Sequence, residues 1–437
     1  MSLRRPISIA VIMALGLTLQ ACAGGGTPTL ALMPAPEAFS DGAFDRAADD
    51  RPVGDIPDGG LLYATGRQKS RGNTPGDFYT TERSLVVHLG EAQISVSRPE
   101  ITWRQARELA LLKAPTRDYP IQVSGVTEYG ILDRSVTPYL DPGPQPVSPA
   151  AATAQFTREV NRRLERTSQK DVYIYVHGYK VTFDNPVLVA AEMWHFMGYE
   201  GVFIAYSWPA TPEATAYVGD VDTAMGMARN LRELVRTLET ETGAERIHII
   251  GYSAGTRLVS RALEQMALLN RDRPGGAYRY GSRLENVFLV SSDVDRSVFG
   301  AYLADGILEV SRHLVIYASE KDEALRISEA ITGHQRLGEA LPADSVPPSL
   351  SQLLKSRADR ISYIDVSRAP NVESGNGHGY FRGSPWVSSD LMVKLMYRLD
   401  PEVRGLVRDP QTGILAFPVD YDRRMRKALS GIKRPVP

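Results

Sequence analysis

One serine of the chain stands in a setting that suits nucleophilic chemistry. Ser253 lies between Gly251 and Gly255. The apolar run Ile247–Ile250 precedes this segment, and a helical pattern, Thr256–Leu269, follows it. A serine at a sharp turn from strand to helix needs small residues on both sides, so that a strained backbone fits and the hydroxyl projects from the sheet. The five-letter pattern alone is weak, and its position between a strand and a helix is what predicts a nucleophile.

A nucleophilic serine needs a base, and the base needs an acid that orients it. On sheets that carry such a turn, the three groups follow the order serine, acid, histidine along the chain. His378, in a glycine-rich loop after the apolar run Ile361–Val366, is the histidine that suits this order. His334 also follows the serine but lies in an inserted segment, and His313 begins a strand. We therefore predict His378 as the base.

Several carboxylates compete for the role of the acid. Asp322 follows the run Leu314–Tyr317, at the end of the strand before that of the histidine, and Glu320 is close to it in sequence. Asp293 and Asp295 follow the preceding strand. A carboxylate beyond either strand could reach the same histidine, although many aspartates in turns only accept hydrogen bonds from backbone amides. We favour Asp322 and keep Asp293 and Asp295 as alternatives.

The oxyanion that forms on acyl attack needs two convergent backbone N–H donors. We expect one from Ala254, the residue after the nucleophile. We expect the other from Tyr179, in the loop after the apolar run Val172–Val176, because Gly178 lets the backbone approach closely. His177 would orient this loop through its ring. It has no partners at the spacing of metal ligands, so we predict no metal site, and the mechanism requires no cofactor.

The elements that must position these residues follow from hydrophobic periodicity. Short apolar runs rich in β-branched or aromatic residues, bounded by turn signals, are typical of strands, and apolar residues at spacings of three and four are typical of helices. The predicted strands are Val172–Val176, Val202–Tyr206, Ile247–Ile250, Val287–Val290, Leu314–Tyr317 and Ile361–Val366. The predicted helices are Pro186–Met197, Val221–Thr240, Thr256–Leu269, Glu323–Ile331 and Leu391–Leu399. This alternation predicts an α/β fold, with a mostly parallel sheet covered by helices on both faces.

The rest of the folded part is expected to extend or cap this sheet. Residues 61–146 contain short extended runs and one helical piece, Trp103–Leu112, and should add strands to one edge of the sheet. Residues 333–360 are predicted as a helical insertion before the last strand, and residues 391–437 as a cap. Residues 61–437 are thus predicted as one domain.

Charge and composition exclude some classes of protein. The 50 Lys and Arg residues balance 51 Asp and Glu residues, so no basic face is required and nucleic acid is not expected as a partner. Hydrophobic residues make up 43% of the chain and charged residues 23%, which argues against global disorder. The oligomeric state is not predicted.

The N-terminus has the pattern of a secretion signal. Arg4 and Arg5 precede an apolar stretch, Ile7–Leu19, of 13 residues. A helix of this length is too short to span a bilayer, whereas a basic segment, a short apolar segment and small residues at the end are typical of a cleaved signal. We predict residues 1–21 as a signal peptide.

The end of this signal, Leu19-Gln20-Ala21-Cys22, resembles the lipobox of bacterial lipoproteins. The resemblance implies cleavage before Cys22 and acylation of its thiol and amino groups, which would anchor the protein stably to a membrane. Cys22 is the only cysteine of the chain, so an intrachain disulfide is impossible. We predict a flexible tether at residues 22–60. Ala23 is not the Asp that retains many lipoproteins at the inner membrane, which favours the outer membrane, facing the periplasm.

Four segments occur in the order found in a bacterial group of α/β-hydrolases long labelled as a domain of unknown function. They are Val172–Tyr179, Phe203–Pro209, Ile249–Arg257 and Tyr317–Leu325. The resemblance covers about residues 61–385. It implies the α/β-hydrolase fold, similarity to esterases and lipases, and a triad of Ser253, Asp322 and His378. Tyr252 is a departure, because relatives often have His-Ser-Met where this chain has Tyr-Ser-Ala.

The function expected from these features is hydrolysis of an ester or a related acyl bond by an envelope-anchored enzyme of the carboxylesterase or lipase kind. A thioester or amide substrate would use the same chemistry. A different class is a non-catalytic envelope lipoprotein that uses the fold to bind a lipid or a protein partner. The complete set of serine, histidine, acid and oxyanion loop argues against it. Residues 209–221, with Tyr217, and residues 333–360 could border the acyl pocket, but no substrate follows from the fold.

Overall fold

The computed structural model describes residues 29–31, 33–34, 36–40, 56–72, 77–96, 120–139, 143–271 and 280–432. The signal peptide, Cys22 and the predicted helix Trp103–Leu112 lie outside these residues. In the described part, no helix is both long and apolar enough to cross a membrane.

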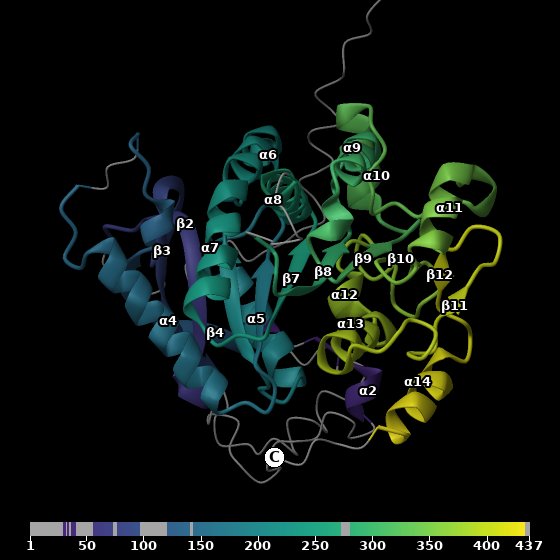
Figure 1. Ribbon diagram of the computed structural model, residues 1–437, viewed down its shortest axis with the longest axis horizontal. Helices are drawn as coiled ribbons and strands as arrows, with labels where there is room; N and C mark the ends of the chain where they lie inside the picture. Colours follow the sequence, from purple (N-terminus) through teal and green to yellow (C-terminus); the bar gives the residue numbers. More distant parts are fainter. Residues whose placement is uncertain are drawn as a thin grey trace, which may run out of the picture.

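A single twisted sheet runs through the described part of the molecule (Figure 1). Its twelve strands follow the order β1-β4-β3-β2-β6-β5-β7-β8-β9-β10-β12-β11. They are β1 (Thr29–Ala31), β2 (Gly60–Lys69), β3 (Tyr79–Val96), β4 (Pro120–Ile131), β5 (Asp171–Val176), β6 (Val202–Ser207), β7 (Arg246–Tyr252), β8 (Leu284–Val290), β9 (His313–Ala318), β10 (Ile361–Asp365), β11 (Val407–Arg408) and β12 (Leu415–Ala416). The strands from β2 to β12 in this order are parallel, and antiparallel pairs occur towards the two edges.

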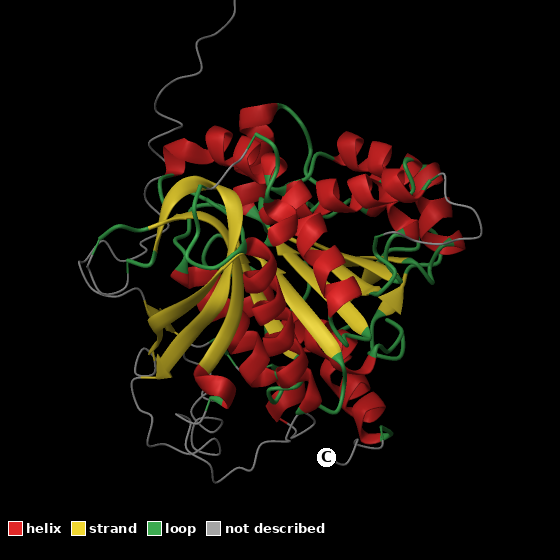
Figure 2. Ribbon diagram, turned by 60° about the vertical axis from the view of Figure 1, so that its left-hand side comes forward, coloured by secondary structure: helices red, strands yellow, loops and turns green. Residues whose placement is uncertain are grey.

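Helices cover both faces of this sheet, as Figure 2 shows. They are α2 (Glu37–Ser40), α4 (Pro149–Glu165), α5 (Asp184–Phe196), α6 (Tyr217–Gly226), α7 (Ala228–Glu241), α8 (Gly255–Asn270), α9 (Arg296–Ala304), α10 (Glu323–Thr332), α11 (Pro348–Ser356), α12 (Tyr380–Gly383), α13 (Pro385–Tyr397) and α14 (Tyr421–Ser430). Alternate side chains of each strand point to opposite faces. In β5, Val172 and Ile174 pack in one core with α4, α7 and α8, whereas Tyr173 and Tyr175 pack in the other with α5 and α13. This confirms the predicted α/β architecture.

The six predicted strands are all present, but two helices differ from the prediction. The helix expected at Val221–Thr240 is divided into α6 and α7, because Gly226 ends α6 where the chain packs closely against Arg83. Periodicity does not reveal this break, since both pieces are amphipathic. The helix expected at Leu391–Leu399 begins earlier, at Pro385, a residue suited to the first turn of a helix.

Part of the predicted flexible tether, residues 22–60, is packed on the folded domain. β1 pairs with β4, and α2 packs against α13. Met33 and Ala38 are buried, and the Ala38 N–H donates to Ser389 Oγ over 2.9 Å. Isolated apolar residues in a Pro- and Gly-rich segment carry no periodicity, so the sequence could not predict that the domain binds them.

Two further expectations for the C-terminal half need correction. In residues 333–360, the expected helical structure is limited to α11 and one 3-10 turn, Ala343–Ser345. This insertion precedes β10, which is not the last strand, because β11 and β12 follow it and β12 pairs with β10. Strands of two residues are too short to leave a periodic signal.

The strand order reverses beside β5. The chain leaves β5 for β6 on one side and returns to β7 on the other. In open α/β sheets, ligands bind outside the carboxyl ends of the strands where the order reverses in this way. The loops that follow β5 and β7 therefore meet at the position where a site is expected.

Candidate active site

Ser253 lies at a strained turn between β7 and α8. Its φ angle is 52°, in a left-handed region that non-glycine residues seldom adopt. The Ser253 N–H donates to the Val290 carbonyl oxygen over 2.9 Å, and the Ser253 carbonyl oxygen accepts from the Thr256 N–H over 2.9 Å. These bonds hold the turn from both sides and turn the side chain out of the sheet.

The glycines around this serine are required by close backbone contacts. A Cβ atom at Gly255 would overlap the carbonyl oxygen of His177, in the loop after β5. A Cβ atom at Gly178 would lie 2.9 Å from Ser253 Cβ, and one at Gly251 would lie 3.0 Å from Val259 Cγ2. The absence of side chains at Gly255 and Gly178 therefore lets the loop after β5 approach the serine, and Gly251 lets β7 pack closely against α8.

His378 connects the serine to a carboxylate. Its Nε2 lies 2.7 Å from Ser253 Oγ, and its Nδ1 lies 2.8 Å and 2.9 Å from the two carboxylate oxygens of Asp322. Asp322 follows β9 and is buried, and its Oδ1 also accepts from the Leu325 N–H at the start of α10. The structure thus brings the predicted nucleophile, base and favoured acid into one hydrogen-bonded array.

The loop that carries His378 is held against the loop that carries Asp322. Gly377 has a φ of 68°, and a Cβ atom there would overlap the Lys321 carbonyl oxygen. The Asn376 carbonyl oxygen accepts from the Glu323 N–H over 3.0 Å. The glycines next to the histidine therefore allow the contact that sets its distance from the acid.

The electrostatics of the site raise the pKa of His378. Burial lowers the pKa of His378, but the charge and hydrogen bond of Asp322, with a further contribution from Asp293, outweigh it, so that the pKa is raised above its ordinary value. A base that is stabilised when it carries a proton is suited to remove the proton of a serine hydroxyl during attack.

The alternative acid Asp293 is occupied elsewhere. Its Oδ2 accepts from Arg257 Nε over 2.8 Å and from the Tyr217 hydroxyl over 2.7 Å. Its Oδ1 accepts from Ser328 Oγ over 2.6 Å. Asp293 therefore joins α6, α8 and α10 beside the serine, and does not orient the histidine.

Asp295 and the remaining candidate histidines also lie outside the array. Asp295 is the N-cap of α9 and accepts from the Ser297 N–H over 2.7 Å. His334 is exposed, with Nδ1 3.5 Å from Asp295. His313 Nε2 lies 2.9 Å from Ser362 Oγ inside the core. These contacts leave Asp322 and His378 as the partners of the serine.

The two expected oxyanion donors are the amides of Ala254 and Tyr179. In the described part of the chain, no acceptor is found for the N–H of Ala254 or of Tyr179. His177 belongs to the loop that carries Tyr179, and its ring Nε2 lies 3.0 Å from the Trp208 carbonyl oxygen. Burial and the charge of Arg67 lower the pKa of His177 to about 3, so its ring is neutral at neutral pH. The contact with Trp208 fixes the ring, as expected for a residue that orients the loop.

Sequence reasoning did not predict the residues that support the His378 loop. Ser291 Oγ donates to the His378 carbonyl oxygen over 2.8 Å, and the Tyr380 hydroxyl accepts from the Ser291 N–H over 2.8 Å. The Tyr252 ring packs on the His378 ring, with centroids 5.2 Å apart. The departure at Tyr252 noted in the sequence therefore lies against the base.

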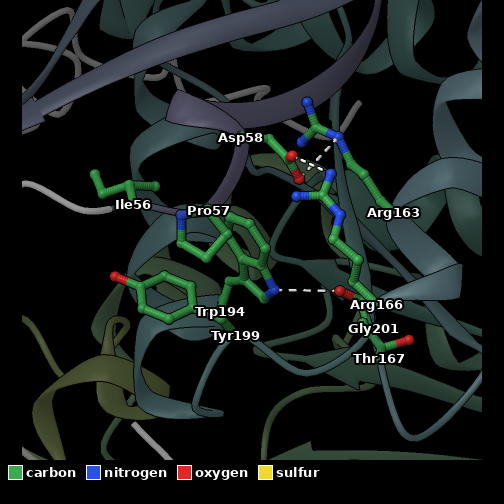
Figure 3. A pocket seen from close by; sticks show the side chains of 9 residues that line it. All are labelled: Ile56, Pro57, Asp58, Arg163, Arg166, Thr167, Trp194, Tyr199 and Gly201. Carbon is green, nitrogen blue, oxygen red and sulfur yellow. Dashed lines mark hydrogen bonds and ion pairs between the residues drawn. The ribbon is translucent and has the colours of Figure 1, made fainter. Parts of the chain in front are cut away.

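A cavity of about 430 Å³ lies near the amino ends of the parallel strands β5 and β6 (Figure 3). Its lining includes residues just before β5 and β6, whereas Ser253 follows the carboxyl end of the parallel strand β7. In Figure 3, Asp58 points towards Arg163 and Arg166, and Trp194 Nε1 donates to the Gly201 carbonyl oxygen over 3.2 Å. This cavity is therefore separate from the serine site.

In the described residues, no group of three or more His, Cys, Asp or Glu side chains is arranged to hold a metal ion.

Comparison with known proteins agrees with this architecture. Residues 152–395 match the family model described as an alpha/beta hydrolase of unknown function, DUF900. The matched segment includes the turn at Ser253, the loop after β5, Asp322 and His378. Searches of curated proteins and of solved structures found no significant match. Because the match covers more than half of the 437 residues, the chain belongs to the DUF900 family of α/β hydrolases.

Proposed function

We propose that this α/β hydrolase is a serine hydrolase that cleaves an ester or a related acyl bond, in the manner of carboxylesterases and lipases. The observation that carries the proposal is the distance of 2.7 Å between Ser253 Oγ and His378 Nε2 at a turn where the serine has a positive φ. A strained turn that aims a hydroxyl at a buried imidazole is the arrangement of an activated nucleophile.

The proposed reaction uses the array in two steps. Ser253 Oγ attacks the acyl carbon while His378 takes the hydroxyl proton, and Asp322 keeps the imidazole oriented and stabilises its positive charge. The amides of Ala254 and Tyr179 bind the oxyanion. His378 then donates the proton to the leaving alcohol. Water, activated by the same histidine, hydrolyses the acyl-enzyme and releases the acid.

A fluorophosphonate probe tests this proposal, because it phosphonylates only an activated serine. We expect labelling of the folded wild-type protein and none of Ser253→Ala. No labelling of the wild-type protein, while a known serine hydrolase in the same sample is labelled, would exclude the catalytic proposal and favour a non-catalytic binding protein. Para-nitrophenyl esters of increasing acyl length, with matching thioester and amide substrates, would then identify the bond and the acyl chain.

We also propose that the enzyme acts at the bacterial envelope as a lipoprotein acylated at Cys22, on the outer membrane and facing the periplasm. The support is the sequence from Leu19 to Cys22. Thr29 belongs to β1 and is fixed to the sheet. Seven residue steps separate Cys22 from Thr29, and at about 3.5 Å per residue they reach at most about 25 Å. The anchor would therefore hold the domain close to the lipid.

The anchor is tested separately from the chemistry. We expect incorporation of an alkyne-labelled fatty acid into the wild-type protein, which should fractionate with outer-membrane vesicles. Cys22→Ser should lose the label and the membrane association, yet keep its reactivity with the fluorophosphonate. A wild-type protein without fatty acid would contradict the anchor and leave the hydrolase proposal standing.

A further inference from the structure

Arg67, in β2, is a buried charge without a carboxylate partner. Its side chain is fully buried, and among the described residues no carboxylate oxygen lies within the 4.0 Å of an ion pair with it. Buried charges are normally paired, because loss of hydration costs several kcal/mol. The guanidinium must therefore be satisfied by hydrogen bonds to neutral acceptors.

Three side-chain hydrogen bonds of Arg67 join it to the segments after β5 and at the end of β6, and a fourth, from Nη1, reaches the Thr80 carbonyl oxygen in β3 over 3.4 Å. Its Nη2 donates to the Val181 carbonyl oxygen over 2.8 Å, in the loop after β5. Its Nε donates to Ser207 Oγ over 2.9 Å, at the end of β6, and its Nη1 donates to the Ala210 carbonyl oxygen over 3.0 Å, in the loop that follows. The planar fork of an arginine can bridge acceptors on two loops in this way, which a lysine cannot.

The same two loops are joined a second time near the serine. Trp208 Nε1 donates to the His177 carbonyl oxygen over 2.7 Å, and the rings of His177 and Trp208 stack with centroids 5.1 Å apart. The loop after β5 is therefore fixed at His177 by Trp208 and at Val181 by Arg67. Tyr179, whose amide is the expected oxyanion donor, lies between these two attachments.

The charge of Arg67 also extends to this loop. Burial lowers the pKa of Arg67 to about 9, partly offset by Asp220 and Asp184, so the guanidinium stays protonated at neutral pH. Its field contributes to the low pKa of His177. A positive charge next to this loop favours negative charge nearby, and the oxyanion would form beside the same loop.

We propose that Arg67 is a positioning residue that holds the Tyr179 amide in the orientation needed to bind the oxyanion. The inference rests on the proposed function, because it assigns a role within the same reaction. Arg67 lies outside residues 152–395, the segment matched by the family model. The N-terminal strands thus contribute to the site as well as extending the sheet.

The test separates the geometry of the loop from the stability of the fold. Full-length wild-type, Arg67→Met and Arg67→Lys proteins are titrated with the fluorophosphonate, and kcat and KM on para-nitrophenyl butyrate are expressed per titrated site. We expect Arg67→Met to lower kcat about 10- to 100-fold, the range for a misplaced catalytic group, with KM changed less than about threefold. Arg67→Lys should recover little of this loss, because an ammonium does not reproduce the fork.

A transition-state analogue gives a second readout that a merely structural role would not move. A trifluoromethyl ketone adds to the serine and carries an oxyanion, so its inhibition constant should rise by the same factor as kcat/KM falls. Arg163→Met is the matched control. Arg163 is also buried and donates to the Gly60 carbonyl oxygen over 2.9 Å, at the amino end of β2. It should lower the melting temperature and leave kcat per titrated site unchanged.

The outcomes distinguish the inference from the function on which it rests. Wild-type values of kcat and of ketone inhibition per titrated site in Arg67→Met would overturn the role of Arg67, whatever its melting temperature. If Arg67→Met does not fold, the same two ratios in Arg67→Lys decide. An unlabelled wild-type protein would instead mean that the proposed hydrolase function fails.

Discussion

The described part of the chain contains two arrays in which a serine, a histidine and a carboxylate are hydrogen-bonded in series. The elbow array consists of Ser253, His378 and Asp322, and the strand array consists of Ser84, His88 and Glu128. The serine oxygen lies 2.7 Å from the histidine in the elbow array and 3.1 Å in the strand array. The shorter distance from histidine Nδ1 to the acid is 2.8 Å and 2.9 Å, respectively. Residue types and distances alone barely separate them.

Backbone context separates the two arrays. The serine side chains are similarly buried, with 6% of Ser253 and 4% of Ser84 exposed, so exposure does not decide between them. Ser253 has a positive φ at a turn next to the amides of Ala254 and Tyr179, for which the described residues provide no acceptor. Ser84 lies within β3, and its Oγ accepts from the Val86 N–H over 3.3 Å. Backbone amides within a sheet are used in the hydrogen bonds between strands, so we do not expect them to bind an oxyanion beside Ser84.

The two acids also differ in their other partners. Asp322 accepts from His378 and caps α10. Glu128 accepts from the Tyr79 hydroxyl over 3.0 Å and pairs with Lys69 over 2.9 Å, in addition to its bond with His88. Its charge is shared among three partners. The two arrays therefore differ in backbone context and in the partners of their acids, and the chemistry is proposed for the elbow array alone.

Removal of each serine is the largest expected difference between the arrays. We expect Ser253→Ala to lower kcat on para-nitrophenyl esters by a factor on the order of 10⁴ to 10⁶, as loss of a nucleophile does in other serine hydrolases. Ser84→Ala should stay within about twofold of the wild-type kcat, because surface and structural hydroxyls do not act on the transition state. Steady-state kinetics on equal amounts of folded protein would measure both. A large loss of kcat in Ser84→Ala, without one in Ser253→Ala, would show that the strand array and not the elbow array is catalytic.

Neutralisation of each acid should separate the arrays by pH dependence. Asp322 raises the pKa of His378 against the effect of burial, and the base must be unprotonated to act, so activity falls as the pH drops through that pKa. Asp322→Asn should lower kcat by about 10⁴, as for the equivalent change in a known triad. It should also move the acid limb of the pH profile to lower pH, because the raising charge is gone.

Glu128→Gln is the matched control for this change. It removes a carboxylate that bonds to a histidine, yet the acid limb and kcat should match those of the wild-type protein. An unshifted limb in Asp322→Asn would mean that a different group controls the profile. Measurement of kcat/KM for the three proteins between pH 4 and pH 9 decides.

The sequence predicted the elbow array because each of its members follows a strand. Short apolar runs identified β7, β9 and β10, and parallel strands bring their carboxyl ends to one edge of the sheet. The glycines around Ser253 and His378 were visible as residues that permit close backbone contact. The choice between Asp322 and Asp293 stayed open. It depends on which carboxylate is hydrogen-bonded by side chains of α6, α8 and α10, and the local sequence does not show this.

The sequence did not predict the strand array or the role proposed for Arg67. Ser84 lies in β3 and Glu128 lies in β4, far apart in the sequence. They come together only through the register of these two antiparallel strands. Arg67 reaches the site because β2 joins the sheet beside β6. Such contacts are set by strand pairing between distant segments, for which one sequence gives no signal.

The smallest expected effect is on stability, and it tests the role of the strand array. Burial alone raises the pKa of Glu128, but its bonds with His88 and Lys69 outweigh burial and lower the pKa from 4.5 to about 2. The unfolded chain therefore binds this proton first as the pH falls. The stabilisation is complete above about pH 4.5 and is lost as the pH drops towards 2, and the shift corresponds to at most about 3 kcal/mol.

Glu128→Gln should then be less stable than the wild-type protein at pH 7, and the difference should narrow between pH 5 and pH 3. Urea unfolding followed by circular dichroism at several pH values would measure it, with Ser84→Ala as a variant that leaves the Glu128 charge in place. A constant difference at all pH values would show that the carboxylate contributes by packing and not by charge. A difference that narrows would instead show that the charge of Glu128 stabilises the fold. The strand array would then use a serine, a histidine and a carboxylate, the residue types of the elbow array, to hold β3 and β4 together.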